Sequence, residues 1–370
     1  MKKIHIIGEG ITAKAVREKI TSDKLFIESS LEDCDFVVVS PGIKPKDFPE
    51  TDKEIISEIE FAFRYYVRSP VIAITGTNGK STVTALIAEG LGVEPLGNFG
   101  KPLILANFDD PYHVVEVSSY QLETCFEFQP HIAVITNITP DHLDWHDTFE
   151  NYFEAKKNIC LMQTKDDYVV YFDEDQVVKD LIRNVLSTKR PFFRPAKDKL
   201  KYNQNYWAAR EVFKILKKSE SEIDAIFQNF KGLPWRIQRV ADASLPAAVY
   251  NDSKSTNPES TIFALQQFDK NIVLLLGGKD KNTDLAAMKR AMQNKIRRLY
   301  VYGEAKERFA RELSEFNPLV RDDLPTILKE ESQISMKDEV LLFSPACASF
   351  DQFKNFEDRG QKFNDWVKSL

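Results

Sequence analysis

The sequence GTNGKST at positions 76–82 places two glycines, a lysine and hydroxyl side chains within seven residues. The apolar run 71–74 before it is typical of a buried parallel strand, and the apolar spacing after it predicts a helix over 81–91. A glycine-rich turn into a helix N-terminus offers unpaired N–H groups to a phosphate, and lysine and serine add a cation and a Mg²⁺ ligand. Ile74 occupies the position where the usual motif has its first glycine. We nevertheless predict a nucleotide-phosphate loop, rather than a plain glycine-rich turn, made of Gly76, Thr77, Asn78, Gly79, Lys80, Ser81 and Thr82.

Two later segments carry side chains that could serve a metal ion. Glu116 ends the apolar run in HVVEVSSYQLE, and His142 follows the apolar run in HIAVITNITPDHLDWH. Ligands of open parallel sheets bind at the carboxyl ends of the strands, so both side chains are expected near the phosphate loop. A carboxylate there suits Mg²⁺, although a capping or ion-paired glutamate would also explain Glu116.

The histidines and lysines that follow in the sequence can be explained without a metal site. His142 and His146 are four residues apart, as in a helical zinc pair, but Pro140 and the mixed ligands favour a loop. In that loop His142 could face Mg²⁺ or a phosphate, and His146 is expected at the surface. Lys156 and Lys157 adjoin in NYFEAKKNIC, and the residues alone favour two solvated lysines.

Strand and helix patterns alternate along the whole chain, which predicts an α/β protein of three α/β domains. Residues 1–69 predict a small Rossmann-like N-terminal domain with a helix over 13–20, and the Gly8-x-Gly10 turn is a weak nucleotide signal. Residues 70–232 predict a central domain with the phosphate loop and a parallel sheet. Residues 233–370 predict a Rossmann-like C-terminal domain, with a hinge in KGLPWR at 231–236.

Composition narrows the class of protein. Of the 370 residues, 43% are hydrophobic and 29% are charged, which is ordinary for a globular protein. A net charge of −6 disfavours broad binding to nucleic acid. No apolar stretch is long enough to cross a membrane, and the first residues lack the apolar run of a signal peptide. The four cysteines have no metal or disulfide spacing, so we expect free thiols in the cytoplasm.

Taken together, these motifs resemble the Mur ligases, which build the peptide stem of the bacterial cell wall. The resemblance rests on GTNGKST, EVSSYQLE, N-x-x-P-D-H-L-D and Y-x-x-A-K, and it extends from Ser40 to the C-terminus. NDSKSTNPEST, LLLGGKDK and SPACASFDQFKNFEDRG are similar to motifs of the D-glutamate-adding members. This implies an ATP-dependent, ADP-forming amide ligase of peptidoglycan precursor synthesis. It would join D-glutamate to UDP-N-acetylmuramoyl-L-alanine through an acyl phosphate.

The resemblance also implies roles for single residues. The loop at 76–82 would hold the ATP phosphates, and the catalytic residues would be Lys80, Glu116, His142, Lys156 and Arg236. Two Mg²⁺ ions would be held by Ser81, Glu116, His142 and Lys156, the last as a carbamate. Asp252 and Lys254 would lie at the nucleotide. The UDP-sugar would contact Ile11, Thr12, Gly42 and Asn98, and D-glutamate would contact Thr256, Lys281, Ser349, Phe350 and Phe356.

Three departures from the family pattern keep alternatives open. The first domain is short, Phe350 replaces a leucine, and in LPWRIQ Trp235 and Gln238 replace a histidine and a carboxylate, while Arg236 remains. The alternatives are another Mur-type or folylpolyglutamate-type ligase, a phosphate-loop kinase, or a nucleotide-binding protein without ligase activity. In each case we expect a monomer with small-molecule partners and no nucleic-acid or membrane partner.

Overall fold

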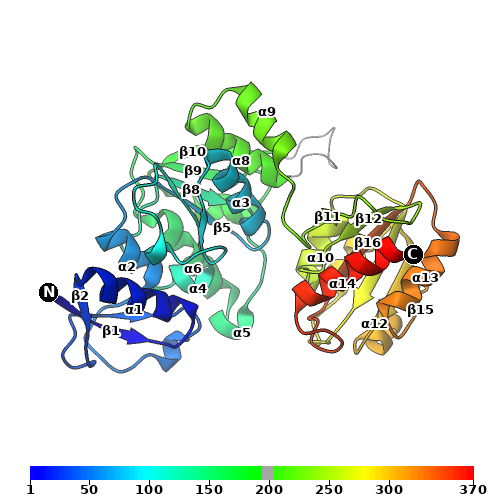
Figure 1. The fold of residues 1–370 in the computed structure, drawn as a ribbon, viewed down its shortest axis with the longest axis horizontal. Coiled ribbons are helices and arrows are strands. Elements are labelled where there is room, and N and C mark those ends of the chain that lie inside the picture. The colour runs from blue at the N-terminus through cyan, green and yellow to red at the C-terminus, as the bar shows by residue number, and fades with distance from the viewer. Residues whose placement is uncertain (194–203) are drawn as a thin grey trace. The chain divides into compact units, whose positions relative to one another are not determined.

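The computed structural model describes residues 1–193 and 204–370. Among these residues, strands gather into three sheets that are parallel throughout except for one short edge strand. This confirms the expected α/β class (Figure 1). The described residues from Met1 to Lys231 form one compact unit, and Gly232 to Leu370 form the other. The domain limits at 69/70 and 232/233 remain a prediction.

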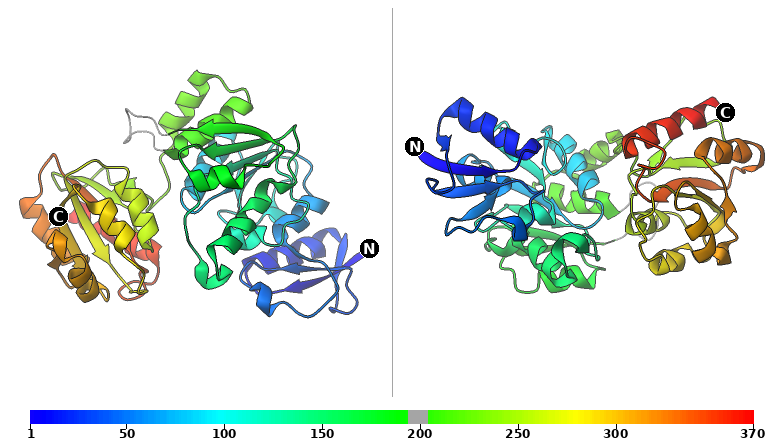
Figure 2. Two further views of the ribbon diagram at one scale, coloured as in Figure 1. Left: turned by 180° about the vertical axis from the view of Figure 1, so that it is seen from behind. Right: turned by 90° about the horizontal axis from the view of Figure 1, so that it is seen from below.

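The first sheet is small and carries α1 against it (Figure 2). Its strand order is β2-β1-β3-β4, and all the pairs are parallel. The helix predicted over 13–20 extends further at both ends, because Gly10 starts it and the left-handed Lys24 ends it. The elements are β1 (Lys2–Ile7), α1 (Ile11–Asp23), β2 (Phe26–Glu28), β3 (Phe36–Val39), η1 (Pro45–Asp47), β4 (Ile55–Ser57) and α2 (Glu58–Tyr65).

The central sheet has the order β10-β9-β8-β5-β7-β6. Its middle strand β5 is buried on both faces, since Val71 and Ala73 enter one apolar cluster and Ile72 and Ile74 enter another. The elements are β5 (Val71–Thr75), α3 (Lys80–Leu91), β6 (Pro95–Gly97), η2 (Leu103–Leu105), β7 (His113–Glu116), α4 (Ser119–Leu122), β8 (Ile132–Ile135), α5 (Leu143–His146), α6 (Phe149–Leu161), β9 (Tyr168–Phe172), α7 (Gln176–Leu181), β10 (Thr188–Phe192), α8 (Gln204–Ile215) and α9 (Glu220–Asn229).

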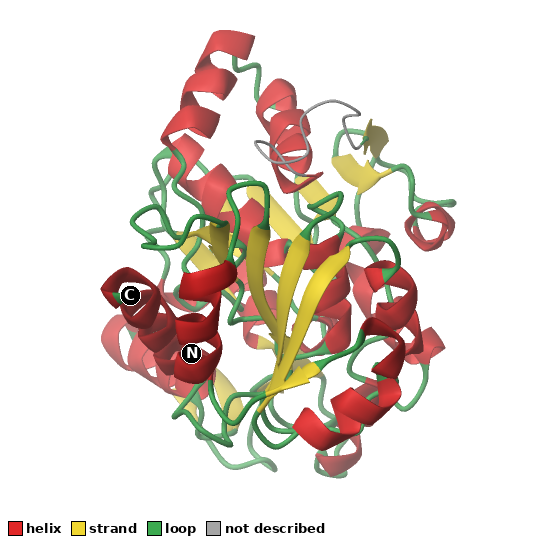
Figure 3. Ribbon diagram, turned by 90° about the vertical axis from the view of Figure 1, so that its right-hand side faces the viewer, coloured by secondary structure: helices red, strands yellow, loops and turns green. Residues whose placement is uncertain are grey.

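The third sheet belongs to the second unit and has the order β11-β12-β16-β13-β14-β15, with β11 antiparallel. Helices cover both faces of this sheet (Figure 3). Its elements are β11 (Gln238–Arg239), β12 (Ala248–Asn251), α10 (Pro258–Leu265), β13 (Ile272–Gly277), α11 (Ala286–Met292), β14 (Ile296–Tyr302), α12 (Lys306–Glu312), η3 (Ser314–Phe316), β15 (Leu319–Val320), α13 (Leu324–Ile334), β16 (Val340–Ala346) and α14 (Phe356–Ser369). Across the described parts of both units, no helix has the length and apolarity to cross a membrane.

Candidate active site

The predicted phosphate loop lies between β5 and α3, as the sequence indicates. Strand β5 ends at Thr75, and α3 starts after Gly79, whose φ of 90° lies in the left-handed region that favours glycine. Gly76 has a φ of 142°, and a Cβ there would stand 2.0 Å from the hydroxyl of Thr136. Both positions therefore favour glycine, because their backbone angles disfavour other residues and a side chain at Gly76 would clash with Thr136. The N-terminus of α3 lies at this turn, and the first backbone N–H groups of a helix can bind an anion.

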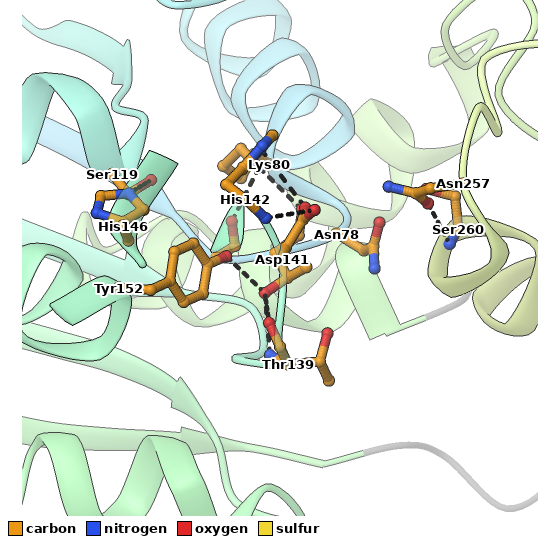
Figure 4. A network of polar contacts seen from close by, with 12 residues as sticks. Asn78, Lys80, Ser119, Thr139, Asp141, His142, His146, Tyr152, Asn257 and Ser260 are labelled. Atoms are coloured by element: carbon orange, nitrogen blue, oxygen red, sulfur yellow. Dashed lines mark hydrogen bonds and ion pairs between the residues drawn. The ribbon is translucent and has the colours of Figure 1, made fainter. Parts of the chain in front are cut away.

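The segment after β8 holds the loop in place. Thr77 shares a hydrogen bond of 2.8 Å with the Tyr152 hydroxyl, and its Oγ1 accepts one of 3.0 Å from the N–H of Thr139 (Figure 4). The backbone N–H of Asn78 donates to Oδ1 of Asn137 over 2.9 Å. Residues of the segment between β8 and α5, together with Tyr152 of α6, thus hold the loop in place. The Thr77 hydroxyl is the group of the loop that bonds both Tyr152 and Thr139.

Lys80 occupies the first position of α3, and its side chain folds back over the loop. Its Nζ donates to the carbonyl oxygens of Gly76 and Thr77, at 2.8 and 2.9 Å. The ammonium charge therefore lies over the turn where phosphates are expected. Ser81 is buried and Thr82 is half-buried on the same turn of the helix.

Glu116 lies beside the start of the loop because β7 pairs with β5 and sets Glu116 opposite Ile74. The carboxylate is buried, with Oε1 accepting 2.6 Å from the Asn98 side chain. Its second oxygen, Oε2, is buried and has no hydrogen-bond partner. An unsatisfied carboxylate oxygen costs free energy, and a cation at this position would remove that cost.

Mg²⁺ fits these residues in the way it usually binds beside phosphates. Among the described residues, no group of three or more histidines, cysteines or acidic side chains is arranged to hold a metal ion. Mg²⁺ commonly takes only one or two carboxylates and completes its shell with phosphates and water. Glu116, with its free oxygen, can supply that carboxylate.

His142 follows β8 and reaches the same edge of the sheet. Its backbone is left-handed (φ 54°), and its Nε2 lies 3.5 Å from a carboxylate oxygen of Asp141. Burial lowers the pKa of His142, while Asp141 opposes that shift. A neutral imidazole nitrogen can ligate a metal or bind a phosphate oxygen. Residues 143–146 form the short helix α5 rather than the open loop that was predicted.

The prediction that His146 lies at the surface is wrong. Its side chain is buried, and its Nε2 lies 2.9 Å from the hydroxyl of Ser119. Burial lowers the pKa of His146 to about 4, so the ring is neutral at pH 7. The sequence does not show this burial, which comes from the packing of His146 against Ser119 and Tyr120 of α4 and Tyr152 of α6.

The two neighbouring lysines differ, so the expectation of two solvated lysines is wrong for one of them. Lys156 is buried, and its Nζ donates to the carbonyl of Gly76 at 2.9 Å and to Oγ1 of Thr75 at 3.3 Å. Burial lowers the pKa of Lys156 well below its usual value, and the charge of Lys80 adds to the shift. Lys157 points away and pairs with Glu154 over 3.0 Å at the surface.

In the second unit, the carboxyl ends of β12, β13 and β16 form a second polar edge. Asp252 follows β12 and is buried, accepting hydrogen bonds from the hydroxyls of Ser255 and Ser344 and from the backbone N–H of Ile237. Burial raises the pKa of Asp252 to about 6, although these bonds and the nearby Arg236 lower it in part. The Nζ of Lys254 lies 3.9 Å from the ring centre of Phe356.

The residues predicted to contact the amino acid lie at the same edge of the third sheet. The loops after β13 and β16 are joined by a bridge between Lys279 and Ala348. Ser349 is buried, Lys281 and Phe350 are exposed, and Thr256 and Phe356 are half-buried. The structure thus groups them on neighbouring loops without testing their predicted roles.

Trp235 has a defined place in the second unit. Its ring packs against Gly360, where a Cβ would stand 2.1 Å from the ring, and lies 6.4 Å from the ring of Phe356. Its backbone N–H donates to the side chain of Gln238 over 3.0 Å. The two residues of LPWRIQ that depart from the family pattern therefore contact each other.

The positions predicted for uridine lie where β1 and β3 of the first sheet end. Ile11 and Thr12 open α1, and Gly42 follows β3. Gly8, with φ 117°, brings the turn after β1 against Ser40, where a Cβ would meet the hydroxyl at 2.6 Å. These residues share one edge of the sheet, and Ile11 and Gly42 are exposed.

Sequence reasoning missed three residues that organise this site. The side chains of Tyr152 and Ser119 and the backbone of Thr139 hold the loop and the turns around it, and none of these residues is a predicted ligand. Tyr152 precedes Lys156 by one helical turn, and that spacing was the available signal. Ser119 and Thr139 gave none, because small hydroxyl residues occur in most turns.

Comparison with known proteins identifies the family. Residues 74–233 match the Mur ligase middle domain, and residues 235–347 match the Mur ligase glutamate ligase domain. The UDP-N-acetylmuramoylalanine–D-glutamate ligase of Caldanaerobacter subterraneus is 35% identical, over 93% of this chain and 86% of that protein. The chain belongs to the Mur ligase family. The enzyme of the same name from Aquifex aeolicus is 34% identical to this Mur ligase, over 91% of this chain and 89% of that protein.

Solved structures of Mur ligases share the fold. The UDP-N-acetylmuramate-alanine ligase of Thermotoga maritima aligns over 100% of both chains with a TM-score of 0.60 and 20% identity. The MurF ligase of Thermotoga maritima, solved in complex with ADP, aligns with a TM-score of 0.61 over 99% of this Mur ligase and 95% of that chain, at 14% identity. At these identities the likeness concerns the fold alone.

Proposed function

We propose that this Mur ligase uses ATP to join D-glutamate to UDP-N-acetylmuramoyl-L-alanine in peptidoglycan precursor synthesis. The observation that carries the proposal is the 34–35% identity with D-glutamate ligases over more than nine-tenths of the chain. A carboxylate oxygen of the acceptor attacks the γ-phosphorus of ATP, giving an acyl phosphate and ADP. The amine of D-glutamate then attacks the acyl carbon and loses a proton, and phosphate leaves with that carboxylate oxygen.

The phosphate loop supports ATP as the phosphoryl donor. Its glycines and the α3 N-terminus present N–H groups, and Lys80 adds a positive charge above the turn. Phosphoryl transfer depends mainly on positioning and on neutralising negative charge. Arg236 is assigned to the transferring phosphoryl group, and Asp252 and Lys254 to the nucleotide, on the family resemblance.

Glu116 is proposed to hold Mg²⁺ together with Ser81, and His142 with Lys156 to hold a second ion. When bound, these ions would supply positive charge to the phosphate oxygens. The support from this chain is the partnerless Oε2 of Glu116 and the position of His142 at the same sheet edge. Asn98, which bonds Glu116, is proposed to contact the UDP-sugar.

Lys156 is proposed to carry a carbamate. Burial lowers the pKa of Lys156 well below its usual value, which favours the neutral amine whose lone pair can attack CO₂. The nitrogen would form a bond to the carbon of CO₂ and lose a proton, and the product is an anion. An ammonium repels a metal ion, whereas a carbamate oxygen can ligate it. The carbamate would convert a buried amine into a ligand.

The remaining substrate contacts are proposed from the resemblance and from their grouping at sheet edges. Ile11, Thr12 and Gly42 would contact the uridine end of the acceptor. D-glutamate would contact Thr256, Lys281, Ser349, Phe350 and Phe356, which lie on neighbouring loops of the third sheet.

Release of ADP with a panel of amino acids tests the proposal. We expect little release until UDP-N-acetylmuramoyl-L-alanine and D-glutamate are both present, and no stimulation by L-glutamate. Stimulation by a different amino acid or by a folate acceptor would assign the chain to another ligase of this kind. Release without an amino acid would indicate a kinase, and no release at all would indicate a nucleotide-binding protein; either result contradicts the proposal.

A further inference from the structure

Two short helices of the first unit are fastened to each other directly beside the candidate metal ligands. Helix α4 begins three residues after Glu116, and α5 begins immediately after His142. The two ligands come from different strands, β7 and β8, which lie on opposite sides of β5 in the sheet. No backbone pairing between β7 and β8 therefore fixes the distance between Glu116 and His142.

Side chains make that connection instead. Nε2 of His146 lies 2.9 Å from Oγ of Ser119, and both residues are buried (Figure 4). The indole N–H of Trp145 donates to Glu123 over 3.1 Å. The ring of Tyr120 stacks on His146 at 5.7 Å and packs on Trp145 at 4.4 Å. We call the Ser119–His146 pair with its packed rings the α4–α5 clasp.

Stability alone does not explain the polar pair at the centre of the clasp. A buried neutral hydrogen bond contributes only about 1 kcal/mol net, and an apolar pair of similar volume would do as well. Nδ1 of His146 is buried without a hydrogen-bond partner, which costs free energy. A hydrogen bond has a directional requirement that apolar contact lacks, so this pair fixes the orientation of α4 relative to α5.

We propose that the Ser119–His146 pair is a positioning device that sets the spacing between Glu116 and His142 for binding Mg²⁺ with the nucleotide. Neither residue would touch the metal. Ser119 would act through Glu116, which precedes α4, and His146 would act through His142, which precedes α5. The inference rests on the proposed function, because it assumes that Glu116 and His142 serve metal ions.

The test compares metal affinity in single and double variants. Mn²⁺ substitutes for Mg²⁺ at oxygen-rich sites, and its binding in the presence of ADP is followed by the paramagnetic resonance signal of the free ion. Loss of residues that support metal ligands typically weakens metal binding by 10- to 100-fold, so Ser119→Ala and His146→Leu should each weaken Mn²⁺ binding by about tenfold. The double variant should lose little more than either single one, because both remove one interaction.

Controls separate positioning from damage to the fold. His146→Gln keeps an N–H near Ser119 and should recover most of the affinity, while Lys157→Ala should match the wild type. Affinity for ADP without metal, and the KM for D-glutamate, should be unchanged in all the variants. Unchanged Mn²⁺ affinity, or losses that add in the double variant, would overturn the inference. Failure of the wild-type protein to bind Mn²⁺ with ADP would overturn the metal assignment of the proposed function as well.

Discussion

Glu58 offers a quantitative test of the packing between α2 and η2. Its carboxyl is buried at the start of α2, where Oε1 accepts a hydrogen bond of 2.6 Å from the N–H of Ile104. Oε2 is buried without a hydrogen-bond partner. Burial raises the pKa of Glu58 to about 7 from the usual 4.5, and the bond from Ile104 lowers it in part.

The free-energy cost follows from that shift. A difference of about 2.5 pKa units, at 1.36 kcal/mol for each unit, is about 3 kcal/mol. Between pH 4.5 and 7 the folded protein holds the proton and the unfolded chain does not. The free energy of unfolding contributed by this group therefore falls as pH rises through that window. Above pH 7 the full cost of a buried carboxylate is present.

The Glu58→Gln substitution removes the charge and keeps an oxygen that can accept from Ile104. The pKa of about 7 already includes the bond from Ile104, so the variant should be about 3 kcal/mol more stable than the wild type at pH 8. At pH 5 the two proteins should differ by less than about 1 kcal/mol. Urea unfolding at both pH values measures this, with the exposed Glu32→Gln as a control. The reasoning would be refuted if the free energy of unfolding differed between Glu58→Gln and the wild type by the same amount at pH 5 and at pH 8.

Three further predictions concern the proposed chemistry. Lys156→Ala should abolish turnover, and small carboxylates should partly restore it, whereas Lys157→Ala should retain activity. The reverse pattern in a steady-state assay would contradict the proposed carbamate on Lys156. Lys281→Ala should raise the KM for D-glutamate far more than the KM for ATP, because its ammonium would pair with a carboxylate. Trp235→His should leave activity within about tenfold, and a large gain would mean that the natural protein is partly disabled.

Local patterns were sufficient to predict the phosphate loop. The strand predicted over 71–74 is β5 (Val71–Thr75), and the helix predicted over 81–91 is α3 (Lys80–Leu91). An apolar run followed by glycines and a helical repeat leaves few other conformations for such a segment. The expected position of Glu116 also agrees, because parallel pairing brings the ends of neighbouring strands to one edge.

Burial could not be predicted from the same patterns. Lys156 and Lys157 are adjacent and chemically identical, yet α6 directs one into the core and the other into solvent. His146 was expected at the surface. Its burial comes from α4, which lies more than twenty residues earlier in the chain, and from Tyr152 of α6. Such contacts are tertiary, and a single sequence carries no direct signal for them.

Transfer of an oxygen atom tests the proposed reaction most directly. UDP-N-acetylmuramoyl-L-alanine labelled with ¹⁸O in its alanine carboxylate would be incubated with ATP, Mg²⁺, D-glutamate and the protein. The account predicts one ¹⁸O atom in each phosphate released, together with an amide product that contains D-glutamate, both read by mass spectrometry. Unlabelled phosphate formed alongside that amide would contradict activation through an acyl phosphate. Labelled phosphate without any amide would contradict the ligase itself.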